Sequence, residues 1–119
     1  MTKYIKQTNP FVIPTTDGKI MEEHFGYTNG NSDLSMAIMT APSGWSEPFQ
    51  TPEFDEYTYV IKGKKQIIID GDKIVLKPGE SIKILKGSRV QYANPFDEVC
   101  EYVAICTPSF SVGLANREG

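Results

Sequence analysis

The sequence is poor in the residues that most often bind metals or form disulfides, since its 119 residues include one histidine and two cysteines. It also lacks a long apolar segment, and no run approaches the roughly 20 residues that span a bilayer. Met1–Pro10 is polar and has none of the apolar character of a signal peptide. We therefore expect a chain without membrane association and a cytoplasmic location.

Basic charge is not in excess either. The net charge at pH 7 is -3, and the Lys and Arg residues are spread along the chain. Nucleic-acid-binding domains usually carry clustered positive charge. The composition therefore predicts no nucleic-acid partner.

The two cysteines, Cys100 and Cys106, belong to one expected strand. Six residues of extended chain span roughly 20 Å, which is beyond the reach of a disulfide. We expect two free thiols, most simply as small buried apolar residues, in a reducing compartment.

Short segments with strand character fill most of the chain. Asp70-Gly71-Asp72 between two apolar runs is typical of a β-hairpin. Many short strands about ten residues apart are typical of a sandwich or barrel. Lys19–Phe25 is the one candidate for a short helix, and Ser109–Gly119 is expected to be an irregular tail on the outside. The expected strands are Leu34–Thr40, Tyr57–Lys62, Gln66–Ile69, Lys73–Leu76, Ser81–Leu85, Arg89–Asn94 and Glu101–Thr107.

Two spaced sets of residues resemble a known family. Gly44, Glu56 and Gly63 stand at the spacing of the first cupin motif, and Gly87 and Asn94 match the end of the second. The sequence therefore resembles a small single-domain cupin, with a distant likeness to the cupin part of ethanolamine-utilisation proteins. The resemblance implies an all-β fold, a cupin-type barrel or jelly roll, formed by residues 1–119 as one domain.

The histidines that bind metal in this family are absent. Gln50, Pro52 and Val90 occupy their positions, and only Glu56 of the usual ligand set is kept. Transition metals in proteins favour imidazole and thiolate ligands. The single histidine, His24, lies outside both motifs. We therefore expect no metal and no other cofactor.

Acidic residues offer one alternative to a metal-free barrel. Glu47, Glu53 and Glu56 lie close together in the sequence and could hold a hard cation through their oxygens. The other interpretation, which we prefer for Glu47 and Glu53, is a solvated loop at the barrel mouth.

The cupin resemblance, combined with strand alternation, places a set of polar residues inside the barrel. A carboxyl buried without a cation favours its protonated form and can act as a general acid or base, so Glu56 is the candidate catalytic residue, assisted by Tyr92 or Gln50. Hydrogen bonds that merely satisfy Glu56 are the alternative. The candidate ligand-binding residues are Gln50, Trp45, Phe49, Thr58, Val90 and Asn94. Trp45 and Phe49 are expected at the rim, where they stack on a ligand or pack on the N-terminal segment or on a second subunit.

These residues leave several functions open. The first is a module that binds a small polar or carbohydrate-like metabolite without converting it. The second is a metal-independent isomerase, epimerase or lyase that uses Glu56 as acid–base. The likeness to ethanolamine-utilisation proteins also allows an accessory role. Tyr57, Tyr59 and Ile61 would give one strand an apolar outer face, so we expect a homodimer.

Overall fold

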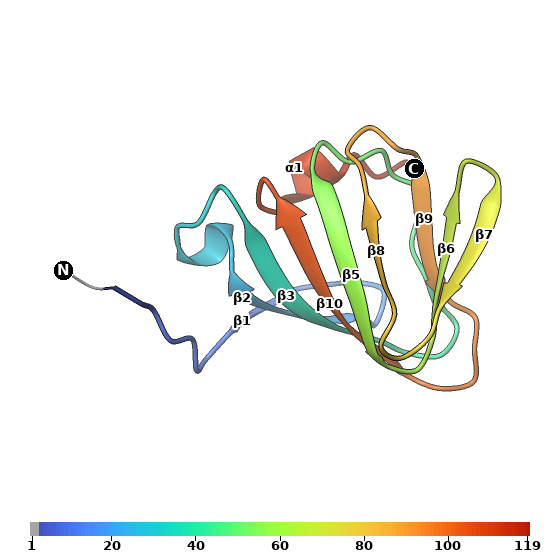
Figure 1. Ribbon diagram of the computed structural model, residues 1–119, viewed down its shortest axis with the longest axis horizontal. Helices are drawn as coiled ribbons and strands as arrows, with labels where there is room; N and C mark the ends of the chain where they lie inside the picture. Colours follow the sequence, from blue (N-terminus) through green and yellow to red (C-terminus); the bar gives the residue numbers. More distant parts are fainter. Residues whose placement is uncertain (1–2) are drawn as a thin grey trace.

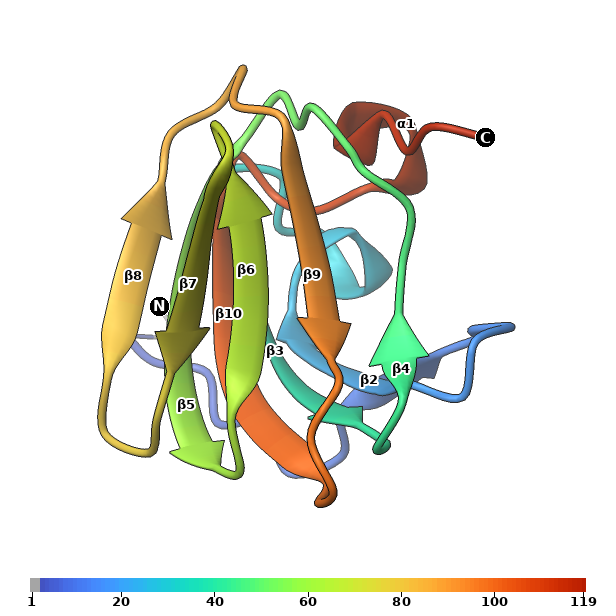
Figure 2. The same cartoon turned by 90° about the vertical axis from the view of Figure 1, so that its right-hand side faces the viewer.

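The computed structural model describes residues 3–119, which form two antiparallel sheets that face each other (Figures 1 and 2). One sheet has six strands in the order β1-β2-β3-β10-β5-β8, and the other has four in the order β4-β9-β6-β7. The strands are β1 Phe11–Ile13, β2 Ile20–Phe25, β3 Ser35–Ala41, β4 Trp45–Ser46, β5 Asp55–Lys62, β6 Lys65–Ile69, β7 Asp72–Leu76, β8 Ser81–Ile84, β9 Val90–Asn94 and β10 Cys100–Thr107. A 3-10 turn spans Tyr27–Asn29, and the short helix α1 spans Val112–Ala115.

The predicted hairpin between β6 and β7 is confirmed. Ile69 pairs with Asp72, and the two residues between them, Asp70 and Gly71, have φ angles of 51° and 79°. Positive φ at both central residues gives the tight turn whose twist suits neighbouring strands. Its sequence signal is strong because few residue pairs other than Asp-Gly tolerate this backbone.

Side chains from both sheets meet in one apolar core. Along β10 the exposure alternates strictly, so Cys100, Tyr102, Ala104 and Cys106 point inward between the sheets. This alternation confirms that both cysteines are buried, and both thiols are free. The period-2 pattern is what a sheet with one buried face requires.

Gly63 at the end of β5 shows why this motif position needs glycine. Its φ is +74°, and a Cβ placed there would lie 2.2 Å from the carbonyl oxygen of Val99. Any side chain would therefore push apart the turn that leads into β6 and the segment that leads into β10.

The prediction of a helix at Lys19–Phe25 is wrong. Ile20–Phe25 forms β2, which pairs with β1 on one side and β3 on the other. Met21 and Glu23 both point inward and are buried. A buried glutamate breaks the apolar–polar alternation by which a strand is normally detected.

The chain end also differs from the prediction of an irregular outer tail. Residues 109–118 run across one end of the barrel (Figure 2) and contain α1, whose first turn is capped by the Ser111 hydroxyl. Arg117 forms an isolated β-bridge with Gln50, and the Glu118 amide donates to the Phe49 carbonyl at 2.9 Å. The tail therefore closes the barrel mouth.

The outer face of the six-stranded sheet carries the apolar strip expected from the sequence. Tyr57, Tyr59 and Ile61 on β5 are 39%, 48% and 43% exposed. Val103 and Ile105 of β10 stand directly beside Tyr59 and Tyr57 and extend the strip. Within residues 3–119, no helix has both the length and the apolar character needed to cross a membrane.

Candidate functional site

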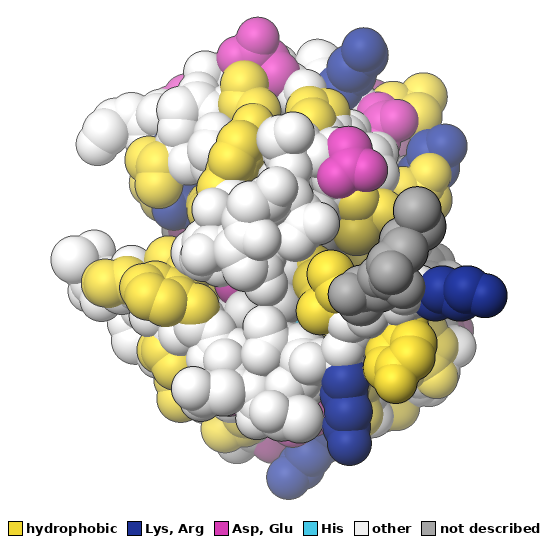
Figure 3. Space-filling view, turned by 90° about the vertical axis from the view of Figure 1, so that its left-hand side faces the viewer, with side chains coloured by type: hydrophobic (Ala, Val, Ile, Leu, Met, Phe, Trp, Pro, Cys, Tyr) yellow, Lys and Arg dark blue, Asp and Glu magenta, His cyan; other side chains and the backbone are white. Residues whose placement is uncertain are grey.

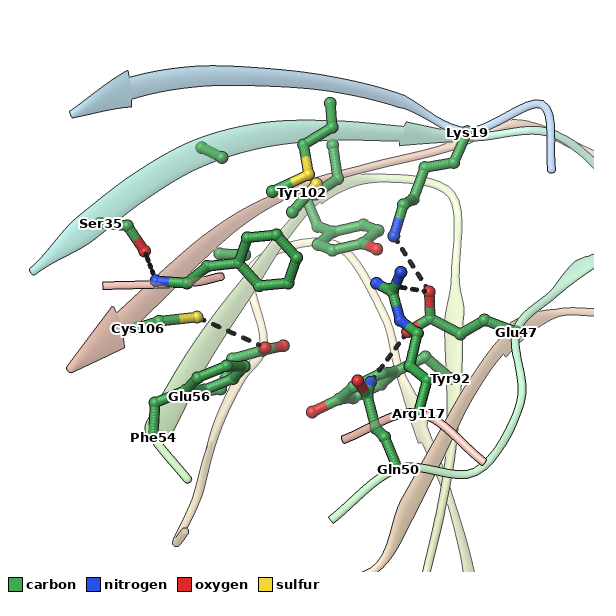
Figure 4. A pocket seen from close by; sticks show the side chains of 15 residues that line it. Lys19, Ser35, Glu47, Gln50, Phe54, Glu56, Tyr92, Tyr102, Cys106 and Arg117 are labelled. Carbon is green, nitrogen blue, oxygen red and sulfur yellow. Dashed lines mark hydrogen bonds and ion pairs between the residues drawn. The ribbon is translucent and has the colours of Figure 1, made fainter. Parts of the chain in front are cut away.

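A narrow cavity lies between the sheets beneath the C-terminal tail (Figure 4). About 20 Å³ is free for the centre of a water molecule, which is room for roughly one water. Five strands, the loop before β5 and the tail all contribute to its wall. The lining residues are Lys19, Met21, Ser35, Ala37, Met39, Glu47, Gln50, Phe54, Glu56, Tyr92, Tyr102, Ala104, Cys106, Phe110 and Arg117.

One side of the cavity is built around the Glu47 carboxylate. Lys19 Nζ lies 3.1 Å and Arg117 Nη2 lies 3.5 Å from the same oxygen, Oε2. Gln50 Nε2 donates to the other oxygen at 2.9 Å. Only 4% of the Glu47 side chain is exposed, so its interpretation as part of a solvated loop is wrong. A carboxylate so buried requires this many partners.

The Glu56 carboxylate lies on the opposite side of the cavity (Figure 4). Its hydrogen bonds are long, from Thr58 Oγ1 at 3.5 Å and from Cys106 Sγ at 3.6 Å. Gln50, expected as a partner of Glu56, instead binds Glu47. Glu56 is therefore held loosely compared with Glu47, and its carboxylate remains open to the cavity.

The side chain of Lys65 lies in the layer beneath the cavity and is 1% exposed. Its Nζ sits 4.1 Å from the ring centre of Tyr92 and 3.8 Å from that of Tyr102, and it donates to Thr58 Oγ1 at 3.4 Å. Burial lowers the pKa of Lys65 from 10.5 to about 8, although the charges of Glu56 and Glu47 oppose the shift. The expectation that no cation accompanies Glu56 is therefore wrong.

Tyr92 brings a hydroxyl group to the cavity that has no partner. Its oxygen is the only buried side-chain N or O atom in residues 3–119 without a hydrogen bond. Burial, reinforced by the charge of Glu56, raises the pKa of the Tyr92 phenol well above its usual value. The group is thus a neutral hydroxyl, and a buried hydroxyl without a partner is costly.

The cavity thiol is not prepared for nucleophilic chemistry. Cys106 lies in the wall, as the strand alternation allowed, but burial raises the pKa of its thiol far above the usual range and the charge of Glu56 adds to the effect. Nucleophilic cysteines need the opposite shift. Cys106 is therefore a buried thiol that donates to Glu56.

The structure separates the other predicted binding residues from the cavity. Trp45 is 4% exposed and donates from Nε1 to Asp17 at 2.8 Å, so of its two expected roles it packs on the N-terminal segment and does not stand exposed at the rim. Phe49 packs under the Arg89 guanidinium, 4.0 Å from its ring centre. Asn94 is fully buried, and its amide donates to three backbone carbonyls that link two loops, those of Ala41, Pro42 and Glu98.

Two more of the predicted binding residues are buried close to the cavity without lining it. Val90 belongs to the apolar core, and Thr58 lies one layer deeper, between Lys65 and Glu56. Of the predicted set, the cavity wall contains Glu56, Tyr92 and Gln50.

The acidic cation site does not form. Glu47 is bound to two cationic side chains, and Glu53 Oε2 accepts a hydrogen bond from Asn116 at 3.0 Å outside the cavity. No three His, Cys, Asp or Glu side chains in the described part of the chain come together as a metal site would require. The Glu47–Glu53–Glu56 alternative is therefore wrong, whereas the absence of a metal remains a prediction.

Three cationic residues of the site, Lys19, Lys65 and Arg117, were not expected from the sequence. Lys65 had a detectable signal, because alternation places it on the same face as Ile67. Lys19 and Arg117 had none, since their shared partner Glu47 lies far from both in the sequence.

Comparison with known proteins agrees with this architecture. A model of the cupin domain family matches residues 37–106. Among curated proteins, an endoribonuclease YbeY of Myxococcus xanthus is 41% identical over 108 residues, which are 90% of this chain and 37% of that protein. An acetate kinase EutQ of Clostridioides difficile is 49% identical over 45 residues, which are 38% of this chain and 29% of that protein. The chain thus spans about a third of the length of the curated relatives that it matches.

Solved structures extend the comparison. The Clostridium difficile EutQ protein superposes with a TM-score of 0.64 at 26% identity, over 88% of this chain and 75% of that one. An RmlC-like cupin from Shewanella frigidimarina gives a TM-score of 0.74 at 14% identity, over 92% of this chain and 93% of that one. At 14% identity the second likeness shows the fold alone.

Proposed function

The chain belongs to the cupin family, and on that premise we propose that its barrel binds a small polar metabolite in the cavity between Glu47 and Glu56, without a transition metal. The unpartnered hydroxyl of Tyr92 carries this proposal. A ligand oxygen that accepts from it would remove the cost of burying it alone. Apolar walls with a few convergent polar groups are typical of small-molecule sites.

A ligand larger than water has further room beside the cavity, because a neighbouring pocket of about 160 Å³ shares Lys19, Phe110 and Arg117 with it. Phe110 and Arg117 belong to the tail and line the cavity. The tail is held by the buried Ala115, which packs with Phe54 and Cys106, and by surface contacts such as the exposed ion pair between Arg89 and Glu118. The exposed pair contributes little stability, so the buried contacts of the tail set most of the cost of opening the mouth.

We expect Tyr92→Phe to lower the affinity for the bound molecule threefold to tenfold, the usual effect of one lost hydrogen bond. Its free energy of unfolding should stay the same or rise by about 1 kcal/mol, because an unsatisfied buried group is removed. Native mass spectrometry of gently purified protein measures the bound fraction and also any metal. Tyr59→Phe, on the outer face, is the matched control.

A destabilised Tyr92→Phe protein with unchanged ligand occupancy would contradict the proposal, because the hydroxyl would then have a structural role. A stoichiometric transition metal in the same spectrum would contradict the metal-free part.

A second candidate function is metal-independent isomerase, epimerase or lyase chemistry with Glu56 as general acid–base. The loose hydrogen bonds of Glu56, at 3.5 and 3.6 Å, favour it, because a carboxyl that exchanges protons must not be locked by strong partners. The neutral Tyr92 hydroxyl is available to assist as a donor.

Glu56→Gln distinguishes the two functions. If the chain is an enzyme of this kind, wild-type protein in D₂O should introduce deuterium into the molecule that co-purifies with it, and Glu56→Gln should slow this exchange at least about 100-fold while keeping the molecule bound. NMR of the molecule follows the exchange. Exchange at the wild-type rate in the variant would exclude Glu56 as the general acid–base. If neither protein exchanges deuterium into the molecule, the binding function is the one of the two that remains.

We also propose that the chain does not bind nucleic acid. On the face in Figure 3, basic side chains are scattered over several separate places and form no continuous patch. The net charge is -3, whereas nucleic-acid sites gather positive charge. The free thiols favour the cytoplasm as location.

We expect the chain to form a homodimer through the strip of Tyr57, Tyr59 and Ile61, since this exposed apolar row continues onto β10. Light scattering at micromolar concentration should give twice the chain mass of 13.3 kDa. Tyr59→Glu should split the pair by burying a charge, and Lys73→Glu, on the exposed strand β7, should not. A wild-type mass of one chain would contradict this expectation.

A further inference from the structure

Building on the proposed function, we propose that the ligand is a short organic acid with one carboxylate, which binds Arg117 while a hydroxyl or carbonyl oxygen at its other end meets Tyr92 and Glu56. The free donors of one residue and the placement of the two carboxylates support this assignment.

The charged groups that line the cavity balance, because Lys19 and Arg117 face Glu47 and Glu56. The deeper Lys65 adds one positive charge, and Asp17, which interacts with Lys19, adds one negative charge. A carboxylate from a ligand therefore needs a cation that still has free donors.

Arg117 is the cation best placed to receive this carboxylate. Its guanidinium has one ion-pair contact, to Glu47 at 3.5 Å, and lies 5.8 Å from the ring of Phe110. The side chain is 35% exposed, against 5% for Lys19. A guanidinium has five N–H donors in a planar fork that suits a carboxylate, so most of them remain available here.

The position of Glu56 fixes the orientation of the ligand. Glu56 lies across the cavity from Arg117 (Figure 4), so it would repel a carboxylate placed at its own end. The end near Glu56 also contains the unpartnered Tyr92 hydroxyl. A neutral oxygen fits there, because it can accept from Tyr92 and from a protonated Glu56 or donate to an ionised one.

The size of the cavity limits the ligand to a short chain. About 20 Å³ is free for the centre of a water molecule in the cavity itself, and a neighbouring pocket of about 160 Å³ shares Lys19, Phe110 and Arg117 with it. Hydroxy and oxo acids of two to four carbons meet this limit.

Matched probes test the assignment. We would measure binding of glycolate, lactate and pyruvate, and of the neutral amides glycolamide and lactamide, by NMR titration of the labelled protein. We expect at least one acid to bind tenfold or more tightly than its amide. Arg117→Gln should remove this preference, whereas Lys64→Gln, which loses the same charge on the surface, should retain it. Thermal unfolding checks that both variants are folded.

Three other outcomes of these measurements would each contradict a specific part of the inference or of the proposed function. Equal binding of acids and amides, or a neutral molecule found in the barrel by native mass spectrometry, overturns the assignment to acids but leaves metabolite binding intact. A preference for acids that survives Arg117→Gln overturns the role of Arg117. If no acid and no amide binds and the purified barrel holds no molecule, the proposed function fails together with this inference.

Discussion

Glu47→Gln should lower the free energy of unfolding by about 3–5 kcal/mol, which is the usual cost of removing one partner of a buried ion pair. The change keeps the shape of the side chain but leaves the Lys19 ammonium, 5% exposed, without a negative charge. Arg117 should suffer less, because 35% of its side chain is exposed and can turn to water. Urea unfolding followed by fluorescence gives the value.

A double substitution keeps this test informative if the single variant does not fold. Lys19→Met with Glu47→Leu removes both charges, so much of the lost stability should return. Glu53→Gln is the control, because Glu53 is an exposed partner of Asn116 and its replacement should cost less than about 1 kcal/mol. A loss of less than 1 kcal/mol in Glu47→Gln would mean that the pair behaves like a solvated one.

Lys65→Met should have the opposite effect and stabilise the protein at pH 7, by about 3 kcal/mol at most. The lysine pKa is 10.5 in the unfolded chain and about 8 in the folded one, because burial disfavours the charged form. Folding at pH 7 therefore requires a buried ammonium, whose direct contacts are the Tyr92 and Tyr102 rings and Thr58. Methionine fills a similar volume without charge.

The pH dependence provides a second, independent readout of Lys65. Between pH 8 and 10.5 the unfolded state binds more protons than the folded state, so wild-type stability gains from Lys65 as pH rises through this window. The variant lacks this gain. The difference in free energy of unfolding between Lys65→Met and wild type should therefore decrease by about 1.5 kcal/mol between pH 7 and pH 9.

Cys100, whose pKa burial raises to about 11 against the opposing charge of Lys65, also affects stability near pH 9. Its contribution cancels in the difference except for the part that depends on Lys65. A Lys65→Met protein that is less stable than wild type at pH 7 would contradict this account. A stability difference between the two proteins that does not depend on pH would contradict it as well.

The strands that the sequence predicted are those with clear alternation or with runs of β-branched and aromatic residues beside a turn signal. β10 alternates over all eight residues and was found almost to its ends. β2 was missed because Glu23, an inward residue, is polar; its burial depends on a turn that lies outside the strand, where Thr28 donates to its carboxylate. Local pattern therefore detects a strand only when the buried residues are also apolar.

The site was only partly predictable for a related reason. Motif spacing and alternation were enough to place Glu56 and Tyr92 on the inner face. The charge that accompanies them was not predictable, since the Lys19–Glu47 pair spans 28 residues and the Arg117 pair joins the loop to the chain end. Such pairs depend on how the two sheets and the tail pack together, and a local pattern in the sequence contains no information about that packing.

The distances along the chain between Lys19, Glu47 and Arg117 also bear on how long the folded state persists. A folding nucleus gains most from contacts between neighbouring segments, such as the β6–β7 hairpin, because long loops are costly to close. The Lys19–Glu47–Arg117 network joins segments that are far apart in the chain, so we expect it to form late in folding. Interactions made after the transition state leave the folding rate almost unchanged and slow unfolding. We therefore expect this network to slow the unfolding of the barrel.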